Sequence, residues 1–247
     1  MPYLAVTPAE LPKLPKLRIP PAHVAYAVGD GGHLVAAELP RNLRGGVMVL
    51  SDRCCGPLSN YNTLCRGILN ECNLRRFSGV LADFEGTMQQ DRHTFLAQLA
   101  DILTRSGRKL YVPEHYAVEN ACVLICTAIS GGTLRERLAD AKRHYGSVAL
   151  DCTRLMMDFP LPCRSGNGKP LDAEELSSLA RRSGMPSFFS SELGANYFTL
   201  CDRGQGHFIL FDTAQTLRQK LQLGEELGYE TAFFMYPEVC DLLGELF

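Results

Sequence analysis

Two acidic side chains, Asp83 and Glu85, end the apolar run Phe77-Ser-Gly-Val-Leu-Ala-Asp-Phe-Glu. The run is typical of a buried strand, and because side chains alternate along a strand, both acids are predicted to share a face with Leu81. Two carboxylates this close cannot both ionise freely in a low-dielectric pocket, so the pKa of one is expected to rise and create a proton donor. The spacing alone fits equally well a pair of loop-edge acids bound to arginine or to backbone groups.

Three further polar residues are candidates for binding a substrate. Glu114 and Tyr116 follow the apolar run at 109–112, and Asp158 follows the run at 147–150. Side chains just after a buried strand lie where barrel enzymes carry their binding groups. Each of the three can also be an ordinary loop or capping residue.

The cysteines and histidines give no sign of a metal or a cofactor. The ten cysteines are scattered through apolar segments without any CxxC pair, and no three or four ligands converge in the sequence. Free, mostly buried thiols in a reducing compartment explain this distribution better than a disulfide framework. We therefore expect no metal site and no cofactor.

The overall charge and the N-terminal region exclude several classes of partner. The chain of 247 residues has a formal net charge of -2 and no long run of lysine or arginine, which argues against nucleic acid and anionic membranes as partners. Residues 1–22 are rich in proline and contain only short apolar stretches, unlike a signal peptide or a spanning helix. We expect a cytoplasmic protein; the sequence does not predict its oligomeric state.

The elements that must position these residues alternate between strand-like and helical segments, as in a parallel sheet with crossover helices. Short apolar runs predict eight strands: His23–Val28, Leu34–Ala37, Val47–Leu50, Gly79–Phe84, Lys109–Val112, Cys122–Thr127, Ser147–Leu150 and Thr231–Met235. Eight strands favour an α/β fold of the (β/α)8, TIM-like type. A single domain over residues 1–247 is expected, since barrels of this length are often one domain.

Helix starts and stops support this pattern in the second half. Thr133 with Glu136, Asp172 with Glu175 and Asp212 with Gln215 have the spacing of capping pairs, and a glycine follows each helix. In the N-terminal half, too few residues separate the first three strand candidates for crossover helices, so this half of the barrel must be abbreviated or partly antiparallel. Residues 160–211 are predicted to form a small α+β insertion before the last strand.

Several segments of the chain match sequence motifs of a known protein family. Residues 77–85 resemble the fourth-strand signature F-D-G-x-D-x-D-W-E of family 18 glycoside hydrolases. The segments Ala195-Asn-Tyr-Phe-Thr-Leu, Phe208-Ile-Leu-Phe-Asp and Thr216-Leu-Arg-Gln-Lys-Leu are similar, in order and spacing, to stretches of the sporulation-type branch of that family. The resemblance covers roughly residues 77–240.

The resemblance implies roles for the two acids. Glu85 would protonate the glycosidic oxygen as the acid/base, and Asp83 would orient the substrate's own N-acetyl group as the nucleophile. A carboxylate beside an attacking acetamido oxygen would also stabilise the developing positive charge. A glycan containing N-acetylglucosamine, of peptidoglycan or chitin type, is the implied substrate.

This chain departs from the family at several supporting positions. The first two aspartates of the signature are Ser78 and Leu81, and the sixth-strand motif M-T-Y-D/E reads Cys126-Thr-Ala-Ile, with Ala128 and Ile129 replacing the tyrosine and the acid. Met235 stands where the last strand usually carries tryptophan, and Tyr236 could replace it as a stacking surface. Loss of a single hydrogen-bond donor of this kind can cost several kcal/mol of transition-state stabilisation.

Two functions therefore remain open from the sequence. The first is a retaining glycosidase that uses substrate assistance, with Glu85 and Asp83 as its catalytic groups. The second is a catalytically inactive sugar-binding or spore-assembly scaffold protein on a hydrolase-like barrel, because fold does not guarantee chemistry. An open groove with aromatic walls would favour the enzyme, whereas a groove filled by Leu81, Ile129 and Met235 would favour the scaffold.

Overall fold

The structure is a computed structural model that describes residues 1–14, 19–53, 56–163, 168–184 and 186–247. The chain divides into two compact units. The first comprises residues 1–125, 141–151 and 229–236, and the second comprises residues 126–140, 152–228 and 237–247. Cys54, Cys55 and part of the predicted insertion, residues 164–167, lie outside the described residues. The expectation of one domain with an insertion at 160–211 stays a prediction.

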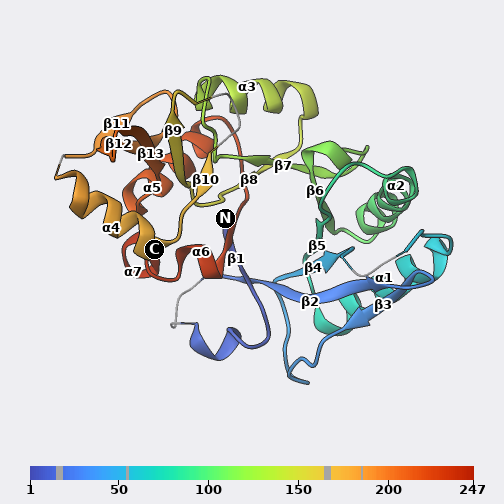
Figure 1. Cartoon of the computed structure of the whole chain (residues 1–247). Coiled ribbons are helices and arrows are strands. Elements are labelled where there is room, and N and C mark those ends of the chain that lie inside the picture. Colours follow the sequence, from blue (N-terminus) through green and yellow to red (C-terminus); the bar gives the residue numbers. More distant parts are fainter. Residues whose placement is uncertain (15–18, 54–55, 164–167, 185) are drawn as a thin grey trace. The chain divides into compact units, whose positions relative to one another are not determined.

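A closed barrel of parallel strands forms the first unit (Figure 1). Neighbouring strands follow the order β1-β14-β8-β7-β6-β5-β4-β2, and the parallel pairing of β1 with β2 closes the ring. Within the described residues the barrel strands are β1 (Pro2–Val6), β2 (Pro21–Gly29), β4 (Val47–Ser51), β5 (Gly79–Asp83), β6 (Lys109–Pro113), β7 (Cys122–Cys126), β8 (Val148–Asp151) and β14 (Ala232–Met235). The predicted (β/α)8 architecture is confirmed.

The first barrel strand is not the one the sequence predicted. All eight predicted runs form strands, but the run Leu34–Ala37 lies in β3 (His33–Ala36), which pairs antiparallel with β2 and stands outside the closed ring. Its place is taken by β1, whose five residues are mostly buried although prolines surround them. A short 3-10 helix η1 (Leu11–Lys13), rather than an α-helix, lies in the described part of the connection to β2. The N-terminal half is thus abbreviated and partly antiparallel, as the short spacings required.

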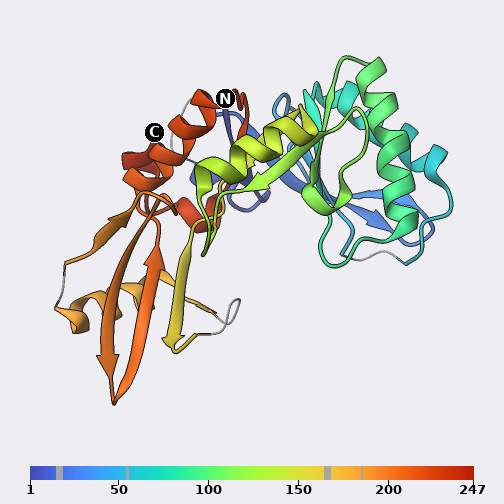
Figure 2. The same cartoon turned by 90° about the horizontal axis from the view of Figure 1, so that it is seen from above.

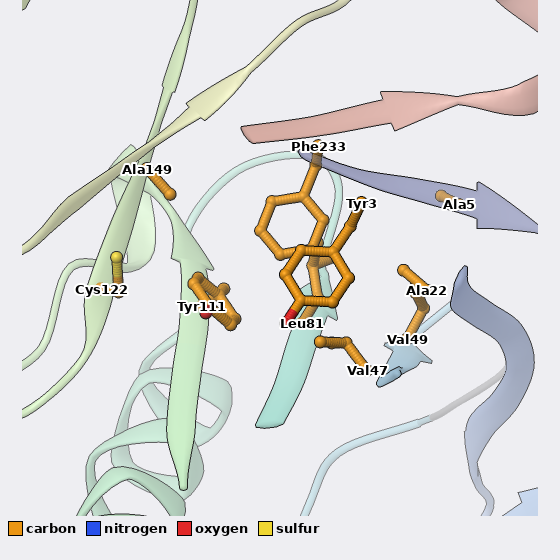
Figure 3. Close-up of a cluster of buried hydrophobic side chains, with 10 residues drawn as sticks. All are labelled: Tyr3, Ala5, Ala22, Val47, Val49, Leu81, Tyr111, Cys122, Ala149 and Phe233. Atoms are coloured by element: carbon orange, nitrogen blue, oxygen red, sulfur yellow. The ribbon is translucent and has the colours of Figure 1, made fainter. Parts of the chain in front are cut away.

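Buried side chains fill the barrel interior (Figure 3). Where a strand contributes two side chains to this cluster, they are two residues apart. The members of the cluster are Tyr3, Ala5, Ala22, Val47, Val49, Leu81, Tyr111, Cys122, Ala149 and Phe233. Rings from three strands meet in it: the ring centroids of Tyr3 and Phe233 are 5.3 Å apart and stacked, and those of Tyr111 and Phe233 are 4.8 Å apart. This packing identifies which face of each strand points inward.

Helices connect the later strands of the barrel. Helix α1 (Tyr61–Arg75) links β4 to β5 and begins at Asn60, whose side chain accepts a hydrogen bond from the Thr63 backbone. Helix α2 (Gln90–Arg105) links β5 to β6 and contacts α1 (Figure 1). The 3-10 helix η2 (Glu114–Tyr116) follows β6, and helix α3 (Leu134–Tyr145) precedes β8. These crossovers place the carboxyl ends of β5, β6 and β8 at one end of the barrel.

An antiparallel sheet dominates the second unit, and its long strands lie side by side in Figure 2. The order is β10-β9-β13-β12-β11, with bounds β9 (Met156–Leu161), β10 (Lys169–Pro170), β11 (Phe188–Ser190), β12 (Ala195–Asp202) and β13 (Gln205–Phe211). Helix α4 (Ala173–Ser183) packs on one face through a cluster that includes Leu176, Phe198 and Ile209. Helices α5 (Ala214–Glu226) and α7 (Leu243–Leu246) contact each other, and α6 (Tyr236–Val239) directly follows β14.

The capping predictions have different outcomes. Asp172 and Glu175 form the predicted reciprocal capping box of α4, and Gly184 ends that helix in the left-handed conformation. The pair Asp212 with Gln215 is wrong, because Thr213 and Thr216 form the capping box of α5 instead. Asp212 is almost completely buried, accepts a hydrogen bond from the Leu155 backbone at 2.9 Å, and lies 2.7 Å from the Lys220 ammonium. It therefore ties α5 to the sheet rather than capping the helix.

Candidate functional site

Asp83 is the last residue of β5 and stands at the carboxyl end of the barrel. Leu81, two residues earlier on the same face, belongs to the interior cluster (Figure 3), so the half-buried Asp83 also faces inward. Burial raises the pKa of Asp83, and the negative charges of Glu85, Asp52 and Asp151 raise it further, whereas Arg53 lowers it. The rise expected for one member of the pair thus falls on Asp83.

Glu85 does not share this environment. Strand β5 ends at Asp83, so the alternation that was predicted to turn Glu85 inward stops before it. The side chain of Glu85 is 59% exposed and forms an ion pair with Arg53, which is 63% exposed. The hydrogen bond to Glu85 raises the pKa of Arg53. Glu85 is therefore a solvated carboxylate with a cationic neighbour, next to a half-buried acid whose pKa is raised.

The segment that presents Arg53 is fixed to helix α2. Asp52, directly before Arg53, accepts a 2.7 Å hydrogen bond from Nε of Arg92, and the side chains of both residues are almost fully buried. Asp91 accepts a 2.7 Å hydrogen bond from the Leu58 backbone and lies 3.1 Å from the Arg92 guanidinium. The buried ion pair therefore ties Asp52, the residue directly before Arg53, to helix α2. Arg53 carries no sequence motif, which is why the sequence did not single it out.

The two candidates after β6 have different roles in the structure. Tyr116 is completely buried, its ring packs edge-on against Phe84 at 5.8 Å, and its hydroxyl accepts a hydrogen bond from the Gln89 backbone at 3.0 Å. Tyr116 has no exposed surface in this structure, and its role in binding a substrate stays a prediction. Glu114 is half-buried in η2, directly after the barrel strand, and stays a prediction.

The last strand presents the positions that the resemblance assigns to sugar stacking. Met235 ends β14 with 40% of its surface exposed, and the half-buried Tyr236 begins helix α6 directly after it. Phe233, two residues before Met235, points into the interior cluster (Figure 3), so Met235 extends the inward face toward the carboxyl end. The binding role of Tyr236 stays a prediction.

Asp158, the remaining candidate, lies in the second unit on strand β9. Its two carboxylate oxygens are 2.9 and 3.0 Å from Nδ1 of His207 on the neighbouring strand β13. The residue is 8% exposed. Asp158 is thus mainly engaged within the sheet, and whether it binds a substrate is a prediction that the structure does not test.

A groove of about 580 Å³ lies within the second unit. Apolar side chains from the start of β9 form much of its wall, and its lining includes Ala128, Leu155, Met157 and Phe159. Arg154 forms a polar corner: its Nη1 donates to the Glu238 carbonyl at 2.9 Å and to the Asp241 carboxylate at 2.7 Å. An apolar groove with a few fixed polar groups is the usual form of a small-ligand site.

An aromatic row crosses the antiparallel sheet on the face away from α4. Ring centroids of neighbouring members are 5.8, 5.2 and 6.4 Å apart in the order Phe188, Tyr197, Phe208 and Phe159. The row starts at the edge strand β11 and ends at Phe159, which also lines the groove. Aromatic side chains therefore lead from the sheet edge to that groove.

Cys65 and Cys72 are buried free thiols, and burial raises the pKa of both to about 12, so neither forms much reactive thiolate at neutral pH. No group of three or more metal-ligating side chains occurs among the described residues. None of the described helices is both long enough and apolar enough to span a bilayer.

No protein-family model and no curated protein matches this chain. Solved structures do match it. The spore cortex-lytic enzyme SleL of Bacillus cereus has a TM-score of 0.64 at 17% identity, covering 100% of this chain and 74% of SleL. A chitinase of Chromobacterium violaceum has a TM-score of 0.66 at 16% identity, covering 96% of this chain and 94% of its own.

A third match is a class V chitinase of Nicotiana tobaccum in complex with NAG4, with a TM-score of 0.59 at 11% identity, covering 95% of this chain and 92% of the chitinase. At these identities the likeness concerns the fold. The sequence resemblance to family 18 glycoside hydrolases is thus supported at that level, and the chain has the barrel fold that these chitinases and the cortex-lytic enzyme share.

Proposed function

We propose that this protein is a glycoside hydrolase acting on N-acetylated glycans of peptidoglycan or chitin type, with Glu85 as the acid/base and Asp83 as its helper. The observation that carries the proposal is the position of the pair. Asp83 ends the fourth strand of the closed barrel, faces inward and has a raised pKa, and Glu85 stands two residues further on in solvent. The carboxyl end of the strands is where barrel enzymes place their catalytic groups.

The division between the two acids suits substrate-assisted hydrolysis. An exposed acid beyond the strand end can reach the oxygen of a glycosidic bond, whereas an inward carboxylate can hold the acetamido group against the anomeric carbon. Ionised Asp83 would stabilise the positive charge that develops on the acetamido group in the transition state. The glycan class follows from this chemistry and from the fold shared with chitinases and a cortex-lytic enzyme, one of them bound to NAG4.

The proposal is tested by hydrolysis of fluorogenic N-acetylglucosamine oligomers and of purified peptidoglycan. Wild type is compared with Glu85→Gln and Asp83→Asn, and with Glu119→Gln as a control, because Glu119 is an exposed acid in the loop before β7. Loss of turnover by about 100-fold or more in the first two variants alone is expected for groups that act in the transition state. Equal turnover in wild type and Glu85→Gln would exclude Glu85 as the acid.

A second function, sugar binding without catalysis, is favoured by one contact. Arg53 forms an ion pair with Glu85, so the side chain that would donate a proton to the glycosidic oxygen already has a partner in the protein. Ala128 and Ile129 also replace the family's tyrosine and acid after β7. If wild type binds the oligomers by calorimetry but releases no fluorophore, the protein is a binding or scaffold protein.

A further inference from the structure

Asp151 is an acidic residue at the barrel's carboxyl end that no sequence motif identified. It is the last residue of β8 and is half-buried. Ala149, two residues before it, points into the interior cluster (Figure 3), so Asp151 lies on the inward face. The pairing of β8 with β14 agrees, because Asp151 is in register with Phe233, whose ring belongs to the same cluster.

Asp83 and Asp151 occupy equivalent positions on two strands of one ring. Each follows by two residues a member of the interior cluster, Leu81 in β5 and Ala149 in β8, and each is the last residue of its strand. In a parallel barrel such residues form a layer above the packed core. The two carboxylates therefore face the same space from different strands.

Other charged groups act on Asp83 as well. Burial is the largest cause of its raised pKa, Glu85 in its own segment is next, and Arg53 after β4 opposes both. Asp52, also after β4, and Asp151 from β8 add to the rise. Asp52 is bound to Arg92 in a buried ion pair, and Glu85 is bound to Arg53. Asp151 makes the smallest of these contributions, and it acts on Asp83 from a strand that is not a neighbour of β5 in the ring.

We propose that Asp151 is a positioning residue of the candidate site, whose carboxylate, facing the barrel mouth from β8, helps Asp83 to keep its proton. A negative charge across the mouth makes ionised Asp83 less favourable, so Asp83 keeps its proton to a higher pH than it would beside a neutral residue. This electrostatic link does not depend on what the protein binds. The link would also set the pH above which ionised Asp83 can assist an acetamido group, and this catalytic consequence rests on the proposed function.

The link is tested by titrating the Asp83 carboxyl directly. Protein labelled with ¹³C at the aspartate carboxyls is followed by NMR across pH, and Asp83→Asn identifies the resonance. Asp151→Asn, which keeps the shape and removes the charge, is expected to lower the pKa of Asp83 by roughly half to one pH unit, the size of effect expected for a like charge several ångströms away. Asp151→Glu, which keeps the charge, should restore most of the shift.

Glu119→Gln is the control for a general change in charge, since Glu119 is an exposed acid in the loop before β7. An Asp83 titration that is the same in wild type and Asp151→Asn, or that shifts equally in Glu119→Gln, would overturn the inference whether or not the protein hydrolyses glycans. If it does hydrolyse them, the acid limb of its pH profile should move to lower pH in Asp151→Asn by the same amount as the Asp83 pKa. The NMR titration tests the electrostatic link, and the hydrolysis assay separately tests the proposed function.

Discussion

Asp83 and Glu85 are two residues apart in the chain, yet they have different surroundings. Asp83 belongs to the strand and takes the inward direction that the pleat gives it, whereas Glu85 lies beyond the strand end, where the alternation no longer applies. The half-buried acid therefore has the raised pKa, and the exposed one has an arginine partner. At the scale of single residues, strand length decides which acid is desolvated.

The raised pKa of Asp83 predicts a dependence of stability on pH. The folded protein holds this proton more tightly than the unfolded chain, so ionised Asp83 destabilises the fold once the pH exceeds the ordinary pKa of aspartate. Asp83→Asn cannot ionise, and we expect it to have a higher Tm than wild type at neutral pH. Below the ordinary pKa, both states of wild type carry the proton and the difference should vanish.

Scanning calorimetry of wild type and Asp83→Asn at acidic and neutral pH checks this prediction. A variant that is less stable than wild type at neutral pH would show that Asp83 contributes favourable contacts that outweigh its desolvation. Such an asparagine variant would also lose glycan hydrolysis if the proposed function is correct.

Tyr116 predicts a separation of stability from binding. Tyr116→Phe removes the acceptor of the Gln89 amide next to the start of α2 and is expected to lower the free energy of unfolding by about 1–2 kcal/mol. Because Tyr116 has no exposed surface, sugar binding should not change. Urea denaturation and calorimetric binding, run on the same preparation, test both halves; weaker binding at unchanged stability would support the predicted role of Tyr116 in the substrate site.

Between elements, a buried ion pair joins helix α5 to the antiparallel sheet. Lys220 of α5 and Asp212, directly after β13, have fully buried side chains 2.7 Å apart. Asp212 also accepts hydrogen bonds from the Leu155 backbone and the Thr216 hydroxyl. A carboxylate held by three donors fixes the direction in which α5 leaves the strand. The sequence predicted a cap at Asp212 because an acid before a helix is usually one.

Lys220→Met tests this junction. Removing one partner leaves an uncompensated buried charge, which is expected to cost about 3–5 kcal/mol of stability. Lys109→Met is the matched control, since the ion pair of Lys109 with Glu230 is exposed at 3.5 Å and should contribute less than about 1 kcal/mol. Equal effects of the two substitutions in urea denaturation would contradict the structural role of the buried pair.

At the scale of the whole molecule, the closure of the barrel depends on strands from both ends of the sequence. Strand β1 pairs with β14 on one side and with β2 on the other, and Tyr3 stacks on Phe233 inside the ring. The N-terminal strand is therefore as much a part of the core as the central strands.

Phe233→Ala should reveal this dependence. The ring is 5% exposed and contacts both Tyr3 and Tyr111, so its removal is expected to cost about 3–5 kcal/mol. Phe188→Ala removes the same side chain from a position that is 51% exposed and should cost much less. If the two substitutions lower the denaturation midpoint equally, the ring packing does not hold the barrel closed.

The sequence by itself determined the later strands, the capping box of α4 and the presence of an acid pair at the end of the fourth barrel strand. These features are local: apolar runs, helix start residues and alternation are set by neighbours within a few positions. The resemblance to family 18 glycoside hydrolases rested on motifs of the same local kind, and the fold comparison agrees with it.

Only the tertiary structure decided which strand closes the ring, which acid is buried, and what lies opposite it. Strand β1 was not among the predicted strands, because its partner β14 is more than 200 residues away in the sequence. The pairing of Arg53 with Glu85 and the facing positions of Asp151 and Asp83 join residues from separate strands, and no local pattern records such pairs. Burial and charge at the site depend on these long-range neighbours, so the chemistry that the acids can perform is set by the closed barrel.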